Sequence, residues 1–241
     1  FFTFQIYGDF SGYSDIALGT SKLFGIRLLQ NFSFPYFSRD IAEFWRRWHI
    51  SLSSWFKDYL YIPLGGSKGG TFMRLRNTFI IFLVSGFWHG ANWTFIVWGL
   101  LNALYFVPLL LSEKNRQHLN IVAEGRLLPT FGDTLRIGTT FILTVFAWIF
   151  FRAASVTQAW EIITSIFSSS ILQPLQILPK ILILLLGFFM TVEWVGREGH
   201  YGLEKIGYRW PKILRWLFYC LLLVMIAMYS GSEETFIYFQ F

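Results

Sequence analysis

The sequence predicts an all-α, polytopic integral membrane protein. Of its 241 residues, 54% are hydrophobic and only 14% are charged, whereas about a quarter of a soluble domain is charged. Several apolar runs are long enough to cross a bilayer, which takes about 20 helical residues. Basic residues between these runs give the net charge of +6, a pattern typical of loops that face anionic headgroups. We therefore expect a lipid bilayer as partner and no nucleic acid.

Cysteine and histidine content limits the chemistry. The single cysteine, Cys220, excludes an internal disulfide and a cysteine-rich metal site. The four histidines are scattered and have no metal-ligand spacing, so we predict no metal. The chain starts at Phe1 inside an apolar segment without a signal-peptide pattern, and we expect it to lack the N-terminal half of a longer protein.

The first element, Phe1–Phe24, is long enough to span but contains Asp9 and Asp15. Gly8 and Gly12 have the small-xxx-small spacing that lets transmembrane helices approach closely. We therefore expect this helix to face protein rather than lipid. A role in holding neighbouring helices and a direct chemical role both remain open for the two carboxylates.

After a break at Asn31–Pro35, the segment Asp40–Leu60 predicts one amphipathic helix along the membrane interface. Its apolar positions are 41, 44, 45, 48, 52, 55, 56 and 59. Its polar face carries Glu43, Arg46, Arg47, Lys57 and Asp58. His49 falls at the edge of the apolar face, where it either reaches into a cavity or makes a structural hydrogen bond.

The loop Tyr61–Arg76 contains four glycines around Ser67 and Lys68. Its spacing does not match a P-loop, and no strand precedes it. We interpret it as a tight basic loop at the interface, still able to meet an anionic donor headgroup. The basic segment Arg39–Arg76 suggests a cytoplasmic side.

The strongest functional signal is Val84–Gly99, VSGFWHGANWTFIVWG, which places His89 between two apolar runs. An imidazole at or near membrane depth is costly and is a functional-site hypothesis by default. Trp88, Asn92 and Trp93 offer aromatic walls and an amide that can hydrogen-bond a ligand. The alternative is a packed histidine bonded to a neighbouring helix.

The surrounding segment Asn77–Leu111 would be about 50 Å long as one helix, more than a single span needs. We expect a break near Gly86–Asn92 that creates two half-length or tilted helices. Irregular backbone at that depth is tolerated only when it is buried in protein or lines a cavity. We therefore expect His89 to line a cavity.

The remaining sequence predicts alternating polar loops and spans. In order, these are a polar loop 112–133 with a solvated His118, a span 134–151, a short surface helix 157–170, a span 175–195, a polar loop 196–212 with His200, a span 213–229 and an aromatic tail, FIYFQF. The sequence shows no internal repeat, which weighs against inverted-repeat transporters.

Three ordered stretches carry a family resemblance: DFSGYSDIALG (9–19), FWRRWHISLSSWFKDYLYIPLGG (44–66) and SGFWHGANWTFIVWG (85–99). Together they resemble the membrane-bound O-acyltransferase family. Within it they resemble the bacterial branch that includes the alginate O-acetylation protein and its D-alanyl-transferring relatives. The likeness covers about residues 5–111 and the tail, whereas 112–230 matches only as a series of spans.

The resemblance implies a helical ring with interfacial helices, a central funnel and a broken helix at the catalytic histidine. The chain would be the C-terminal part of a single catalytic domain, 1–241, without its N-terminal helices. The family's WHG histidine falls on His89, taken as catalytic, and the WRRWHIS histidine falls on His49. Relatives often carry a third histidine where this chain has Asn102 and Ala103, which puts a third histidine's role in doubt.

The resemblance also implies the reaction. The family moves an acyl group from a cytoplasmic thioester, acetyl-CoA or an acyl-carrier protein, to a hydroxyl, with no tightly bound cofactor. In this branch the acceptor is an extracytoplasmic polysaccharide or envelope polymer, often reached through a periplasmic or extracellular partner protein. The location implied is a bacterial inner membrane, crossed several times. Acetyl is the first inference for the acyl group, with D-alanyl or a longer group open.

In this hypothesis His89 is the general base, because a neutral imidazole can remove a hydroxyl proton during attack on a thioester. His49 orients the acceptor or serves the donor end of the tunnel. The expected pocket residues are Trp88, Asn92, Trp93, Trp45 and Trp48. Second-tier candidates are Asp9, Asp15, Lys57 and Asp58.

Two other functions remain as alternatives. A transporter or channel could use Asp9, Asp15 and His89 to carry protons or ions. A non-catalytic scaffold could dock a partner through the helix Asp40–Leu60. The aromatic surroundings of His89 weigh against the first alternative, and the second has no need for a WHG pocket.

Overall fold

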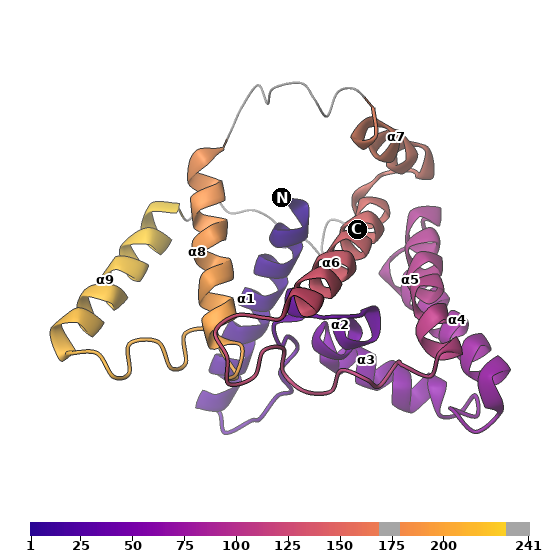
Figure 1. Ribbon diagram of the computed structural model, residues 1–241, viewed down its shortest axis with the longest axis horizontal. Coiled ribbons are helices and arrows are strands. Elements are labelled where there is room, and N and C mark those ends of the chain that lie inside the picture. The colour runs from indigo at the N-terminus through magenta and orange to yellow at the C-terminus, as the bar shows by residue number, and fades with distance from the viewer. Residues whose placement is uncertain (169–178, 230–241) are drawn as a thin grey trace. The chain divides into compact units, whose positions relative to one another are not determined.

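The computed structural model describes residues 1–168 and 179–229, and its ribbon is shown in Figure 1. Within these residues the chain is helical with connecting turns and contains no strand, so the all-α prediction is confirmed. The chain divides into two compact units, Phe1–Pro179 and Lys180–Phe241. The candidate site lies in the first unit.

Three helices among the described residues are long and apolar enough to cross a membrane. They are α5 (Trp93–Leu111), α6 (Phe131–Arg152) and α9 (Lys212–Tyr229). The spans predicted at 134–151 and 213–229 are therefore confirmed. α1 (Phe2–Leu23) and α4 (Gly70–His89) are helices of spanning length. Both carry charged residues that reduce their hydropathy.

The helix α1 forms where it is predicted, but its glycines are open. A Cβ added at Gly8 or Gly12 would meet no atom within 4 Å. Within the part of the chain that the structure describes, the expected close helix approach at these glycines is therefore absent. Asp15 is exposed on the same helix.

The predicted single helix over 40–60 is wrong. The chain instead forms α2 (Ile41–Arg47), α3 (Ile50–Phe56) and a π-helical turn, η2 (Lys57–Tyr61). The break lies at Trp48, which is extended, and His49, which has left-handed backbone angles of φ 45° and ψ 56°. The apolar spacing continues across the break, so periodicity alone does not reveal it.

The predicted polar face of α2 is partly buried within the protein. The Glu43 carboxylate is 1% exposed and accepts hydrogen bonds from Arg39 at 3.0 Å and Arg47 at 2.8 Å. Asp40 caps α2 by accepting the Glu43 backbone N–H at 2.7 Å. A buried carboxylate requires such partners, and this ion cluster therefore belongs to the protein interior.

The same face of α2 holds the loop that follows α5. Arg39 donates to the Asn120 carbonyl at 2.7 Å, and Arg46 donates to the His118 carbonyl at 2.8 Å. The His118 side chain is only 11% exposed and lies 4.0 Å from the Asp40 carboxylate. The expectation that His118 is solvated is therefore wrong, because hydrogen bonds from Arg39 and Arg46 hold its loop against the protein.

The helices α4 and α5 form a tightly packed antiparallel hairpin, seen at the right of Figure 1. A Cβ added at Gly86 would lie 2.3 Å from the Phe95 carbonyl oxygen, and one at Gly99 would lie 2.3 Å from the Phe82 carbonyl oxygen. Each helix thus presents a glycine to the backbone of the other. Both helices are longer than the half-length segments expected.

The rest of the first unit is α6 followed by the short helix α7 (Val156–Ile166). The Ser155 hydroxyl caps α7 by accepting the Gln158 N–H. The predicted surface helix 157–170 is confirmed as α7, and residues 169–170 lie outside the described part. An η1 turn (Pro35–Phe37) connects α1 to α2.

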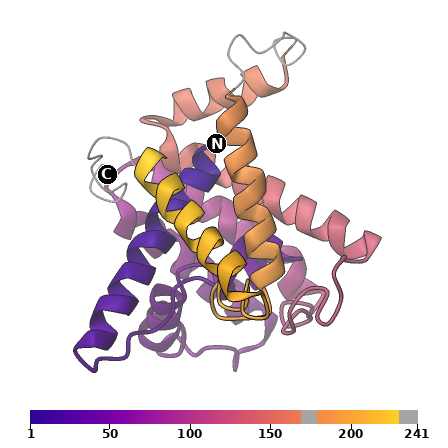
Figure 2. The same ribbon diagram turned by 90° about the vertical axis from the view of Figure 1, so that its left-hand side faces the viewer.

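The second unit consists of α8 (Lys180–Gly196), a loop and α9, joined at their lower ends in Figures 1 and 2. α8 forms within the span predicted at 175–195, but its 17 described residues do not place it among the helices long and apolar enough to cross a membrane, and 175–178 lie outside the described residues. The loop with His200 is present as predicted. The aromatic tail FIYFQF lies outside the described residues.

Candidate functional site

An aromatic cluster fills the interior of the first unit and connects its two histidine motifs. Trp48, at the end of α2, is 1% exposed, and its ring centroid lies 5.1 Å from that of Trp148 on α6. Trp148 in turn lies 5.1 Å from Phe151 and 5.9 Å from Trp98 of α5. Large rings packed in this way exclude water from the space between the motifs.

His89 is the last residue of α4 and lies against this cluster. Its imidazole centroid is 5.0 Å from Phe151 and 5.3 Å from Trp98, both approached edge-on. Trp88 covers it at 5.0 Å. The turn at Gly90 allows this arrangement, because a Cβ there would lie 2.6 Å from the Phe95 ring.

His49 lies at the break between α2 and α3. Its imidazole contacts Phe10 of α1 edge-on at 4.7 Å, and its Nδ1 lies 3.4 Å from the Asn31 Oδ1. Burial lowers the pKa of His49 to about 4, because the interior solvates the charged imidazolium poorly. His49 is therefore a neutral imidazole at physiological pH.

The aromatic cluster links the two predicted catalytic histidines, although 40 residues separate them in the sequence. Trp48, the residue before His49, belongs to this cluster, and His89 lies against it. An imidazole nitrogen that carries no proton can accept one from a hydroxyl group. The catalytic role of the two histidines stays a prediction.

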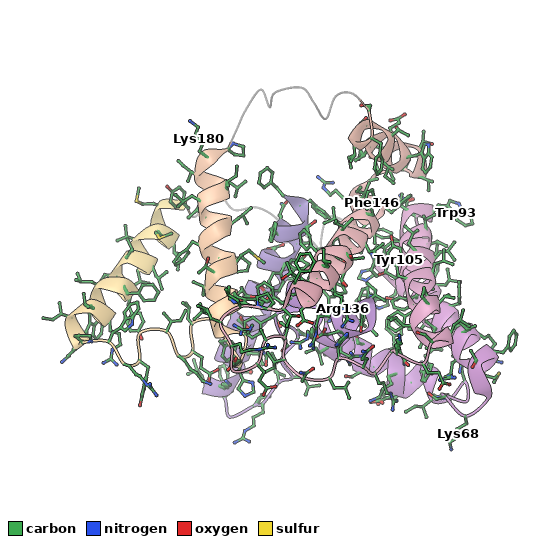
Figure 3. The ribbon with its side chains drawn as sticks, viewed as in Figure 1. Lys68, Trp93, Tyr105, Arg136, Phe146 and Lys180 are labelled. Atoms are coloured by element: carbon green, nitrogen blue, oxygen red, sulfur yellow. The ribbon has the colours of Figure 1, made fainter. Side chains whose placement is uncertain are left out.

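The predicted pocket residues divide into two groups. Trp45 and Trp48 are part of the interior, and Trp45 donates its indole N–H to the Asn102 Oδ1 at 3.1 Å. Trp88 is 55% exposed and Trp93 is 75% exposed, and Figure 3 shows Trp93 projecting outward at the start of α5. Trp93 therefore lies at the rim of the site in this unit.

Asn92 has a structural task in the described chain. Its side-chain oxygen caps α5 by accepting the Thr94 N–H at 3.1 Å, and its amide donates to the Ala154 carbonyl at 3.1 Å. These two bonds tie the turn after His89 to the end of α6. A polar ligand would compete with them.

The second-tier residues lie apart from the aromatic cluster. Lys57 and Asp58 form an exposed pair with 3.5 Å between their charged atoms. Asp15 is exposed on α1, and Asp9 is partly buried there. Among the described residues no group of three His, Cys, Asp or Glu side chains could hold a metal ion.

Comparison with known proteins identifies the family of this chain. Residues 1–150 match the MBOAT, membrane-bound O-acyltransferase family. The chain belongs to this family.

Three relatives show how far the likeness extends. A protein named "Probable alginate O-acetylase AlgI" from Pseudomonas aeruginosa is 44% identical over 167 residues, 69% of this chain and 30% of its own length. A protein of the same name from Pseudomonas putida is 35% identical over 100% of this chain and 52% of its length. A "Peptidoglycan O-acetyltransferase" from Helicobacter pylori is 43% identical over 67% of this chain and 29% of its length. The chain thus spans about a third to a half of these relatives.

The MBOAT match covers both histidines, the aromatic cluster up to Trp148, and Asn102. Asn102 is 2% exposed. Its amide donates to the Trp98 carbonyl at 2.9 Å while its oxygen accepts from Trp45. In this MBOAT chain the position therefore supports the tryptophans behind His89.

Sequence reasoning missed three residues of this MBOAT site. Trp148 and Phe151 lie in a segment interpreted only as a span, and one-dimensional hydropathy gives no sign of which face meets His89. Asn31 lies in an irregular break, where its reach to His49 depends on tertiary pairing. In the sequence, the only indication was that Asn31 lies in a break between two predicted helices.

A cavity of about 410 Å³ lies beside Asn31. It is bounded by α1, by residues 27–29 and by Ser51, and it contains the exposed Arg27 on one side. His49 and His89 are not among the residues that line it. The cavity therefore adjoins His49 through Asn31 and Phe10.

Proposed function

We propose that the protein containing this chain is a membrane O-acyltransferase that transfers an acetyl group from a thioester to hydroxyls of an extracytoplasmic polysaccharide in bacteria. The observation that carries the proposal is an aromatic cluster that contacts His89 and includes Trp48, the residue before His49, in a chain of the MBOAT family. The names of its relatives, which include alginate and peptidoglycan O-acetylating proteins, support the polysaccharide acceptor.

The chemistry assigned to His89 is general base catalysis. Its neutral imidazole takes the proton of the acceptor hydroxyl as the oxygen attacks the thioester carbonyl. The tetrahedral intermediate collapses, the C–S bond breaks, and the imidazolium returns the proton to the departing thiolate. One ester and one free thiol are formed, and no further reactant is needed. His49 orients the acceptor hydroxyl.

The aromatic cluster supports the assignment of His89 as general base. Trp98 and Phe151 hold the His89 ring from two sides and keep water away from the thioester. Exclusion of water matters because a base able to activate a sugar hydroxyl also activates water. A cytoplasmic acetyl-CoA or acyl-carrier donor, a partner protein on the outer side and an inner-membrane location complete the proposal.

The test uses the full-length protein in proteoliposomes with a radiolabelled acetyl thioester and an envelope polysaccharide extract. General base catalysis contributes about 10²–10⁴-fold, so His89→Ala is expected to lower kcat by at least about 10²-fold. His200→Ala, at a histidine of the second unit, is the matched control and keeps the wild-type rate. Inserted, folded protein is quantified for each variant.

Two results would overturn the proposal. Wild-type turnover in His89→Ala would remove the general base, and a folded wild-type protein that consumes no acyl thioester would remove the acyltransferase activity. Transfer from a D-alanyl thioester in place of acetyl would support the mechanism and correct the acyl group.

A further inference from the structure

The backbone around His49 is held by the segment before α2. The Ser33 N–H donates to the Arg47 carbonyl at 3.0 Å, and the Ile50 N–H donates to the Asn31 carbonyl at 3.0 Å. These bonds pair the irregular segment with the α2–α3 break on both sides of His49. They stabilise His49 in left-handed backbone angles, a conformation that residues other than glycine rarely adopt.

The orientation of the Asn31 amide follows from its neighbours. The Ser51 backbone N–H lies 3.2 Å from Oδ1, and the Ser51 hydroxyl lies 2.6 Å from the same atom. A backbone N–H can only donate, so the Asn31 atom that faces it is the oxygen. On the other side, the Asn31 Nδ2 donates to the Ser14 hydroxyl at 3.0 Å.

This orientation determines the tautomer of His49. Its Nδ1 lies 3.4 Å from the same Asn31 oxygen, and an oxygen that only accepts requires a protonated Nδ1 opposite it. The other nitrogen, Nε2, then carries the lone pair. Phe10 holds the ring plane edge-on at 4.7 Å, so the imidazole is fixed in both orientation and protonation.

We propose that Asn31 is a positioning residue that holds His49 with its proton on Nδ1, so that Nε2 accepts a hydrogen bond from the acceptor hydroxyl. The inference rests on the proposed function and extends it, because it assigns a different role to each histidine. His49 binds and aligns the hydroxyl through Nε2, while His89 removes the proton.

A purely structural role for Asn31 makes a different prediction. Its oxygen satisfies the Ser51 N–H in the first turn of α3, so its loss would reduce folded protein without changing the chemistry of what remains. The side chains that contact the His49 ring and its Nδ1, Phe10 and Asn31, are neutral, and so is Ser51, which shares the Asn31 oxygen. The other titratable group that interacts electrostatically with His49 is His89. A new charge at position 31 would therefore act on the His49 imidazole directly.

The kinetic test compares Asn31→Leu and Asn31→Asp in the full-length proteoliposome assay. Asn31→Leu removes the acceptor and is expected to lower kcat roughly 10–100-fold per folded molecule, a part of the general-base advantage. Asn31→Asp keeps an acceptor, retains most of kcat near neutral pH, and moves the acidic limb of the pH–rate profile to higher pH. The limb moves because a carboxylate stabilises the imidazolium.

The matched control is Asn77, another buried asparagine with several hydrogen bonds, in the first half of α4. Asn77→Asp introduces the same carboxylate away from the histidines and leaves the acidic limb in place. An unmoved limb in Asn31→Asp, with losses in Asn31→Leu that follow folded protein alone, would overturn the inference.

The tautomer can be measured without activity. Solid-state NMR of ¹⁵N-histidine-labelled protein, with the His49 signal assigned by its loss in His49→Gln, reports which nitrogen carries the proton. We expect a protonated Nδ1 in the wild type and a mixture in Asn31→Leu. A protonated Nε2 in the wild type would overturn the inference even if the enzyme is active. An inactive wild type with protonated Nδ1 would instead locate the failure in the proposed function.

Discussion

The glycine contacts of the α4–α5 hairpin predict a measurable steric effect. Gly86→Ala would place a Cβ 2.3 Å from the Phe95 carbonyl oxygen, where ordinary contact begins at 3.4 Å. Because that oxygen belongs to the backbone of α5, the two helices must separate by about 1 Å. Overpacking of this kind typically costs about 1–3 kcal/mol.

A second glycine supplies the control. Gly138→Ala lies in α6 and its Cβ would meet nothing within 4 Å. An alanine in a helix is about 0.5–1 kcal/mol more favourable than a glycine, so Gly138→Ala is expected to be neutral or stabilising. The difference between the two variants isolates the steric cost from the helix propensity, which both share.

The assay is the apparent Tm of the purified full-length protein in detergent, followed by turnover at a temperature where both variants are folded. One kcal/mol corresponds to about 2–4 °C for 150–250 residues, so Gly86→Ala is expected to melt several degrees below Gly138→Ala. A 1 Å displacement can also cost about 10²-fold in rate, because α5 carries Trp98 against His89. Equal Tm values with wild-type turnover would refute the reasoning.

Two further predictions concern buried charge. Glu43→Gln leaves Arg39 and Arg47 without their carboxylate and is expected to destabilise the protein by about 3–5 kcal/mol, measured as a lower Tm. The control, Lys57→Ala, breaks only an exposed ion pair worth about 0–1 kcal/mol. Equal losses of Tm in the two variants would contradict the burial of Glu43. Burial lowers the pKa of His49 to about 4. Between this pH and about 6.5, His49 therefore binds a proton in the unfolded chain but not in the folded one. Stability therefore falls by an amount on the order of 3 kcal/mol as pH falls through this window, and the pH dependence of Tm should flatten in His49→Gln. An unchanged slope would contradict a neutral buried His49.

The sequence was informative where a physical rule acts locally. Hydropathy predicted α6 and α9, because a bilayer demands a continuous apolar run. A local rule also predicted a functional histidine in the WHG stretch, because a titratable group between apolar runs is costly unless it has a use; this function stays a prediction. Neither rule depends on which elements later become neighbours.

The sequence misled where tertiary contacts reverse a local pattern. Glu43 lies four residues from Arg39 and from Arg47, and this spacing is typical of a solvated helical face. In the fold the same three residues become a buried ion cluster, because the loop near Asn120 closes over them. The break at His49 was missed for a related reason, since its stabilising bonds come from Asn31 in another segment.

The position of both histidines at helix breaks has a physical reason. Within a helix, the side-chain direction is fixed by the neighbouring turns, and its backbone groups are satisfied internally. At the end of α4 and at the α2–α3 break the chain changes direction, which places the His89 imidazole against the aromatic cluster and the His49 imidazole against Phe10. The cost is a set of backbone groups that need partners, which Asn31 supplies at His49 and Asn92 supplies after His89. The placement of each histidine and the satisfaction of the nearby backbone are therefore coupled, and substitution of either asparagine should disturb the histidine beside it more than the helix it caps.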